Sequence, residues 1–184
     1  MHWHISWQAL VLSVLLFVAG LLLGTYRDRD EPTHSTASER LQPAPTSSPS
    51  SSGGTTVYVP VYSSVYLGVS SRKQTAELAA TVSVRNTSAV HPITLQWVRY
   101  YDSSGTKVRD YLDKPSALRP LGAVEFVIQR ADTTGGPGAN FLIRWDGPTD
   151  VDQPLIEAVM FGQSGSAAVS FTSRGQVVKS APRE

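Results

Sequence analysis

An all-β fold, an antiparallel β-sandwich of immunoglobulin-like size, is predicted for residues 57–178 by three observations. Apolar and polar residues alternate with a period of two, clusters of turn-forming residues separate the alternating segments, and no amphipathic helix of ten residues follows Tyr26. Without helices to connect parallel strands, neighbouring strands should pair antiparallel. About seven to nine short strands suit a sandwich, and a small β-barrel is the alternative.

The clearest alternation extends from Thr75 to Arg85, where Leu78, Ala80, Val82 and Val84 share one face. The same period recurs at 93–97, 124–128, 141–145, 156–160 and 169–171. In residues 93–97, this alternation places Trp97 on the inward face with Ile93 and Leu95. The chain contains no cysteine, so no disulfide can support the fold, and we expect a core built around Trp97 and Trp145.

Residues 1–26 predict a transmembrane anchor that stays uncleaved. This segment contains no Asp, Glu, Lys or Arg, and Ile5–Gly24 is long enough to cross about 30 Å of hydrocarbon as a helix. Trp3, Trp7 and Tyr26 lie at its ends, where aromatic rings favour the headgroup region. A signal peptide is the alternative, but it requires a basic amino-terminal region and a small-residue cleavage site, which the sequence lacks.

Residues 27–56 follow as a predicted linker. Residues 43–56 contain only Pro, Ala, Thr, Ser and Gly, so they offer little apolar area to offset the entropy of ordering, and we expect disorder. Arg27 and Arg29 favour a cytoplasmic carboxyl side under the positive-inside rule. The layout of one span, a long linker and a domain is instead that of an exported, single-pass protein, and we expect a periplasmic or extracellular domain. Residues 179–184 form a short tail.

The composition restricts the classes of function. The 16 basic and 15 acidic side chains nearly balance, which argues against a nucleic-acid partner, since nucleic-acid binding requires clustered positive charge. Without cysteine there is no thiolate nucleophile and no Cys-ligated metal, and no cofactor is expected. The predicted domain contains one histidine, His91, so a Ser–His catalytic pair has few possible partners.

Five ordered motifs in residues 57–178 resemble a bacterial family, the domain of unknown function 3124. The resemblance implies a bacterial, exported protein behind an amino-terminal hydrophobic segment, and it assigns no activity and no functional residues. The motifs are Val57-Tyr-Val-Pro-Val-Tyr62, Tyr100-Tyr-Asp-Ser-Ser-Gly105, Gly135-Gly-Pro-Gly-Ala-Asn-Phe141, Ile156-Glu-Ala-Val-Met-Phe-Gly162 and Ser170-Phe-Thr-Ser-Arg-Gly175.

Two glycine-containing motifs resemble catalytic or nucleotide-binding loops but lack the histidine or the helix that such loops require. Gly162-Gln-Ser-Gly-Ser166 departs from the nucleophile-elbow pattern, and no histidine follows it, so a hairpin turn is predicted. Gly135–Gly138 precedes a strand rather than a helix, which predicts a β–β loop instead of a phosphate cradle.

Acidic side chains provide weaker candidate sites. Asp146, Asp150 and Asp152 lie in one loop and could gather a hard cation, although a solvated acidic loop explains them as well and no metal is expected. Asp102, Asp110 and Glu157 are the carboxylates on which an envelope hydrolase would depend, because glycoside hydrolysis needs two acids about 5–10 Å apart. We also expect Arg174 to pair with a carboxylate such as Glu157.

Tyrosines form the most suggestive surface feature. Tyr58, Tyr62 and Tyr66 share one parity, and Tyr100 and Tyr101 adjoin a predicted hairpin turn. Exposed tyrosines can stack on sugars or anchor a partner protein, although tyrosine on a sheet also commonly covers its cross-strand neighbours. The sequence therefore predicts a non-enzymatic, membrane-tethered interaction module with an unknown envelope protein or glycan as partner. The alternatives are a carbohydrate- or small-ligand-binding domain that uses these tyrosines, and the carboxylate-dependent hydrolase.

Overall fold

The computed structural model of the chain describes residues 40–44, 54–68, 75–165 and 167–179. Contacts divide the chain into two units, 1–34 and 35–184, and every described residue belongs to the second. The predicted anchor, residues 1–26, and most of the predicted linker lie outside the described residues. Within the described residues, no helix is long and apolar enough to span a bilayer.

Twelve strands are found in this described part, and every pairing between them is antiparallel. They are β1 (Gln42–Pro43), β2 (Thr55–Pro60), β3 (Ser64–Tyr66), β4 (Thr75–Arg85), β5 (Ile93–Tyr101), β6 (Lys107–Asp110), β7 (Ser116–Leu118), β8 (Ala123–Ile128), β9 (Asn140–Asp146), β10 (Leu155–Ser164), β11 (Ala167–Arg174) and β12 (Gln176–Val178).

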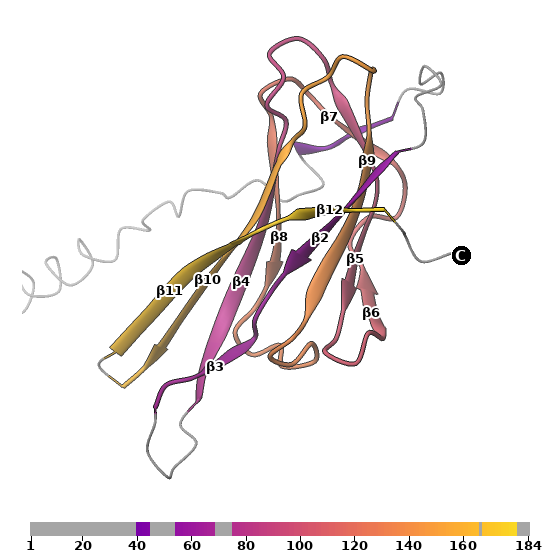
Figure 1. The fold of residues 1–184 in the computed structure, drawn as a ribbon. Coiled ribbons are helices and arrows are strands. Elements are labelled where there is room, and N and C mark those ends of the chain that lie inside the picture. Colours follow the sequence, from indigo (N-terminus) through magenta and orange to yellow (C-terminus); the bar gives the residue numbers. More distant parts are fainter. Residues whose placement is uncertain (1–39, 45–53, 69–74, 166, 180–184) are drawn as a thin grey trace, which may run out of the picture. The chain divides into compact units, whose positions relative to one another are not determined.

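These strands form two sheets (Figure 1). The seven-stranded sheet has the order β1-β7-β5-β9-β2-β12, with β6 also paired to β5. The five-stranded sheet has the order β11-β10-β4-β3. Residues 75–77 of β4 pair with β3, and residues 80–85 of β4 pair with β8. One of the two sheets is curled as a half-barrel. The prediction of an all-β, antiparallel fold is confirmed.

The two sheets share one hydrophobic core, and the predicted alternation supplies most of it. Leu78, Ala80, Val82 and Val84 of β4 are all buried. The seven-stranded sheet contributes the other side of the core; its largest fully buried side chains are Tyr100, Phe141, Ile93, Leu95, Leu118, Ile143 and Val59. Trp145 is 6% exposed and lies in this core, as predicted.

Trp97 does not lie in the core, and the prediction that it does is wrong. The pairing of β5 with β9 shifts by one residue between Leu95 and Trp97, which is a β-bulge at Gln96. Because side chains alternate with a period of two, one extra residue moves every later side chain to the opposite face. Val98 and Tyr100 consequently enter the core, whereas Trp97 is half-buried on the outer face.

Part of the predicted linker belongs to the folded domain. Gln42 and Pro43 pair with Ala117 and Ser116 of β7, and Leu41 packs against the core. Thr55 and Thr56 likewise begin β2. The expectation of disorder across residues 27–56 therefore does not hold at these positions, because backbone pairing with β7 and β9 replaces the apolar area that the composition lacks.

The two tryptophans provide a test of the bulge. Trp145→Ala should lower the free energy of unfolding by about 3–5 kcal/mol, because it removes a large side chain from the core. Trp97→Ala should cost about 1 kcal/mol, since its ring is half-buried on the outside. Denaturant midpoints of the two variants measure both values, and an equal or greater loss for Trp97→Ala would contradict the outward position.

Candidate binding surface on the seven-stranded sheet

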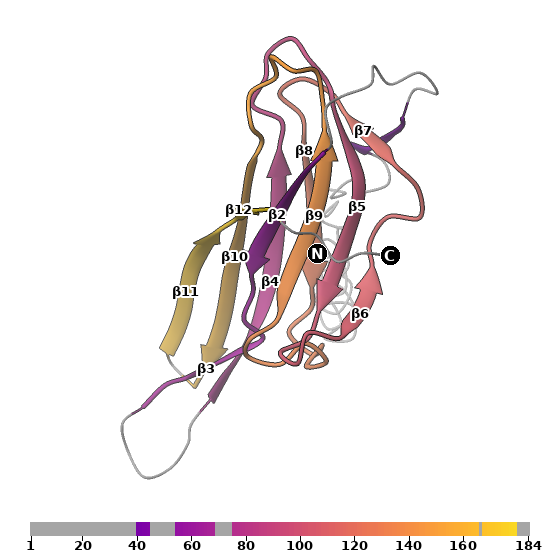
Figure 2. The ribbon, with the colours of Figure 1, turned by 45° about the vertical axis from the view of Figure 1, so that its right-hand side comes forward.

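Six side chains from three neighbouring strands cover the outer face of the seven-stranded sheet, and we name this set the Trp97 face. Figure 2 shows the three strands, β2, β9 and β5, running side by side in that order. Each of the six residues is half-buried. The set consists of Tyr58 from β2, Leu142 and Arg144 from β9, and Trp97, Arg99 and Tyr101 from β5.

The strand register fixes how these residues lie. Tyr58 pairs with Leu142, and Leu142 pairs with Arg99, so these three form one row across the sheet. Arg144 pairs with Trp97 in the next row, and Tyr101 lies two residues beyond Arg99 in the row on the other side. Trp97, Arg99 and Tyr101 therefore form a stripe along β5 that spans about 13 Å.

Arg99 is held in place over the tryptophan. Its Cζ lies 4.5 Å from the centroid of the Trp97 ring, and its Nε donates to Asp110 Oδ1 at 3.3 Å. Lys107 Nζ donates to the other oxygen of Asp110 at 2.7 Å. The hydrogen bond from Lys107, helped by the charges of Lys107 and Arg99, lowers the pKa of Asp110 below its usual value. The carboxylate thus stays ionised and orients the guanidinium.

A second set of polar contacts fixes the part of the face beside the bulge. Gln96 Nε2 donates to Asp146 Oδ2 at 2.5 Å, and Arg144 Nη1 donates to Thr56 Oγ1 at 3.3 Å. The Trp97 face therefore combines aromatic rings with guanidinium groups whose positions are fixed. This combination suits a ligand that offers both apolar C–H faces and oxygen acceptors.

The structure brings together only two of the five tyrosines predicted to bind a ligand. Tyr58 and Tyr101 share the Trp97 face. Tyr62 lies where the chain passes from β2 to β3, with its ring 5.6 Å from that of Phe171. Tyr66 is 68% exposed on β3, in the five-stranded sheet. The shared parity of Tyr58, Tyr62 and Tyr66 does not give a common face, because the chain changes sheet between them.

The expectation that Tyr100 belongs to an exposed surface is wrong. Its side chain is fully buried, 5.1 Å from the Phe141 ring between centroids. Its hydroxyl lies near the Gly135 amide but has no hydrogen bond of good geometry within the described part of the chain, so its proton has no acceptor there. Burial, with a contribution from the charge of Asp132, raises the pKa of Tyr100 to about 12. Tyr100 and Tyr101 are adjacent in a strand, so one of them necessarily faces inward.

The predicted catalytic carboxylates do not converge. Asp102 caps its own hairpin turn, accepting from Ser104 Oγ at 2.6 Å and from the Thr106 amide at 2.8 Å, and the Ser104 contact in particular lowers its pKa. Asp110 is occupied by Lys107 and Arg99. Glu157 lies on the five-stranded sheet opposite Arg174 in the register, and the structure records no ion pair between these two residues.

The predicted acidic loop does not gather its carboxylates around a point. Asp146 bonds to Gln96, while Asp150 lies 3.5 Å from His91 Nε2, measured to Oδ2. No group of three or more His, Cys, Asp or Glu side chains with metal-binding geometry exists among the residues that the structure describes.

Gly135–Gly138 lies in a β–β loop, as predicted, whereas Gly162-Gln-Ser164 of the other motif forms the end of β10, and the turn begins only at Gly165. Gly165 adopts a φ of 59° in the tight turn between β10 and β11, and Gly136 adopts a φ of 70° in the loop between β8 and β9. These are conformations that glycine adopts without steric cost.

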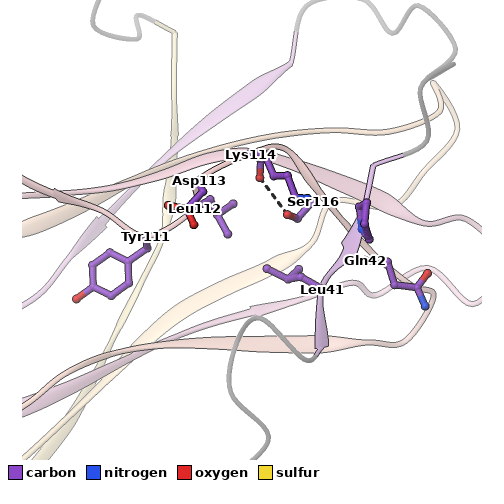
Figure 3. Close-up of a pocket in the computed structure, with 8 residues that line it drawn as sticks. Leu41, Gln42, Tyr111, Leu112, Asp113, Lys114 and Ser116 are labelled. Carbon is purple, nitrogen blue, oxygen red and sulfur yellow. Dashed lines mark hydrogen bonds between the residues drawn. The ribbon is translucent and has the colours of Figure 1, made fainter.

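A groove of about 290 Å³ lies beside the docked β1 strand (Figure 3). Leu41 and Gln42 line one part of it, and Leu112, Asp113 and Lys114 line another. The Tyr111 hydroxyl donates to the Val127 carbonyl at 3.3 Å, and the Ser116 hydroxyl donates to the Lys114 carbonyl at 3.0 Å. Because these hydroxyls already have partners within the domain, the Trp97 face is the stronger candidate site.

The fold defines a small all-β domain made of two antiparallel sheets, with aromatic and basic residues concentrated on one outer face. The chain belongs to the family described as "Protein of unknown function (DUF3124)", which matches residues 54–178. This confirms the resemblance found in the sequence motifs. A search of curated proteins finds no match.

Among solved structures, the chain is similar to the protein in "Crystal Structure of Thermotoga maritima 1070". The sequence identity is 8% and the TM-score is 0.39, and the alignment covers 70% of this chain and 98% of that chain.

The buried Tyr100 hydroxyl predicts two opposite effects of substitution. Tyr100→Phe should raise the free energy of unfolding by about 1 kcal/mol, because it removes a buried donor without a partner. Gly135→Ala should lower it by about 1–3 kcal/mol, since the added Cβ would lie 1.7 Å from the Tyr100 hydroxyl oxygen. Urea denaturation at pH 7 measures both, and a destabilised Tyr100→Phe would show that the hydroxyl does have a partner.

The same hydroxyl predicts a loss of stability in alkali. The folded state holds the Tyr100 proton up to about pH 12, whereas the unfolded chain releases it near the ordinary pKa of 10.0. Stability should therefore fall as the pH rises from about 10 to about 12. Urea midpoints between pH 8 and 11.5 should fall less steeply in Tyr100→Phe than in the unsubstituted chain, and identical slopes would contradict the assignment.

Proposed function

We propose that this chain is a non-enzymatic binding module that is anchored in the membrane by residues 1–26, acts outside the cytoplasm, and binds glycans through the Trp97 face. Residues 57–178 form its β-sandwich of immunoglobulin-like size. The outward position of Trp97 is the observation that carries the proposal. It adds the largest aromatic ring of the face to Tyr58 and Tyr101, which the sequence had already marked as candidates.

The dimensions of the Trp97 face support a glycan. The stripe on β5 extends over about 13 Å, and Tyr58 lies two strands away, at about 10 Å. A face of this size accommodates a short run of sugar rings, which present apolar C–H surfaces to aromatic side chains. Arg99 and Arg144 lie among the rings and can donate to sugar hydroxyl or carboxylate oxygens.

The carboxylates support a binding role over hydrolysis. A glycosidase needs an acid with a raised pKa facing a second carboxylate across the scissile bond. The pKa of Asp102 and that of Asp110 are both lowered, and Glu157 belongs to the other sheet. These three acids thus lack the paired geometry that the hydrolase alternative requires.

Glycan binding can be tested with purified peptidoglycan sacculi as the probe. The full chain in detergent micelles should co-sediment with sacculi, and Trp97→Ala should weaken binding about tenfold or more, because truncating a central aromatic residue typically costs more than about 1.4 kcal/mol. Tyr66→Ala is the matched control, since Tyr66 is exposed but lies on the five-stranded sheet, and it should bind normally. Absence of co-sedimentation, or equal binding by Trp97→Ala, would refute the proposal.

The proposed location is tested by fusing a reporter that is active only outside the cytoplasm after Glu184. The fusion should be active in bacterial cells, because a single span with an exported domain places the carboxyl terminus there. An expressed but inactive fusion would put the domain in the cytoplasm, as Arg27 and Arg29 suggest by the positive-inside rule.

A further inference from the structure

The outer face of the five-stranded sheet carries three exposed apolar side chains. Val127 is 50% exposed, Val159 is 40% exposed, and Phe161 is 55% exposed. The solvent-facing side of an antiparallel sheet is usually polar, so three such residues from two strands of one face are unusual. We name this surface the Phe161 face, and it comprises these three residues with Ala79 and Thr81 of β4.

The register arranges this face in three rows across β8, β4, β10 and β11. Apolar residues alternate with small polar ones in the middle row and in the row of Phe161, and the remaining row carries three charged residues, Glu125, Glu157 and Arg174. The rows are Glu125–Ser83–Glu157–Arg174, then Val127–Thr81–Val159–Thr172, then Ala79–Phe161–Ser170.

We propose that the Phe161 face packs against the same face of a second copy of this chain. The two copies are related by a two-fold axis that runs parallel to the strands, midway between β4 and β10. This axis places β4 of one copy over β10 of its partner, and β8 over β11. The proposal goes beyond glycan binding and does not depend on it.

The sizes of the facing side chains match under this symmetry. Phe161 of one copy lies over Ala79 of the other, so the largest side chain of the face meets one of the smallest. Val159 lies over Thr81 in the same way. Each contact occurs twice, as an isologous interface requires.

The charges also match. Glu125, on β8, faces Arg174, on β11, across the axis, and the symmetry repeats the pair at the other end of the row. Within one copy, these two residues are three strand spacings apart, about 14 Å, which is too far for an ion pair. No ion pair of Glu125 or Arg174 is found in the described part of the chain, and the Glu157 carboxylate, which lies opposite Arg174 in the register, does not form one with it. A second copy supplies one for each.

The available area is that of a weak contact. The central strands β4 and β10 overlap along about ten residues, whereas β8 has six residues and β11 has eight, and these two overlap along about four. The overlapping face therefore measures about 440 Å², and a symmetric pair would bury about 900 Å², the size of a transient interface.

The absence of cysteine makes this contact accessible to site-specific cross-linking. Val159→Cys in the full chain, reconstituted into lipid vesicles and treated with a short bis-maleimide, should give a covalent dimer on denaturing gels. Val108→Cys is the control, because Val108 is exposed on β6 of the other sheet, and it should remain monomeric. Adding Phe161→Asp to Val159→Cys should abolish the dimer. Equal cross-linking of both cysteine variants, or none at Val159→Cys, would overturn the proposal.

Charge reversal tests the axis itself. In the Val159→Cys background, Glu125→Arg should reduce the dimer yield severalfold, because it places like charges opposite each other at both ends. Adding Arg174→Glu should restore the yield, and circular dichroism should show unchanged folding in every variant. Because the two residues cannot pair within one copy, restoration requires the contact between copies. A double variant no better than Glu125→Arg would show that this symmetry is wrong.

Discussion

Alternation of side chains along each strand is the constraint on which this domain depends. The chain has no cysteine, so the two sheets are held together by the apolar side chains buried between them. In a strand, each residue directed into the core fixes its neighbours on the outside. The core and both outer faces are therefore set by one choice of parity per strand, and a single change of parity alters an outer face and the core together.

The bulge at Gln96 is such a change, and its cause can be identified. Without it, the alternation that buries Ile93 and Leu95 would also bury Trp97 and Arg99, and Val98 and Tyr100 would face solvent. Burial of an arginine without a partner costs much more than a local distortion of the ladder. The bulge keeps Arg99 outside, where Asp110 holds it, and Trp97 moves outward with it.

Sequence alternation predicts strands well where one parity holds throughout, as in β4. It fails at Trp97 because tryptophan is apolar and continues the period, which hides the three-residue spacing from Leu95 to Val98 that marks the bulge. It also cannot show that Tyr58 and Tyr66 lie in different sheets, since that depends on where the chain crosses between β2 and β3. Sequence alternation also cannot predict that Gln42 pairs with Ala117, because backbone groups alone join these two distant residues.

The two outer faces point away from each other, and this affects what a pair of copies could do. A two-fold axis parallel to the strands brings the Phe161 faces together and leaves both Trp97 faces on the outside. Corresponding residues of the two copies then lie at the same height along the axis, so both segments 40–44 leave the pair at one end. Under both proposals, such a pair would present two glycan-binding faces in opposite directions, and two weak contacts to separate strands of a polymer would reinforce each other through effective concentration.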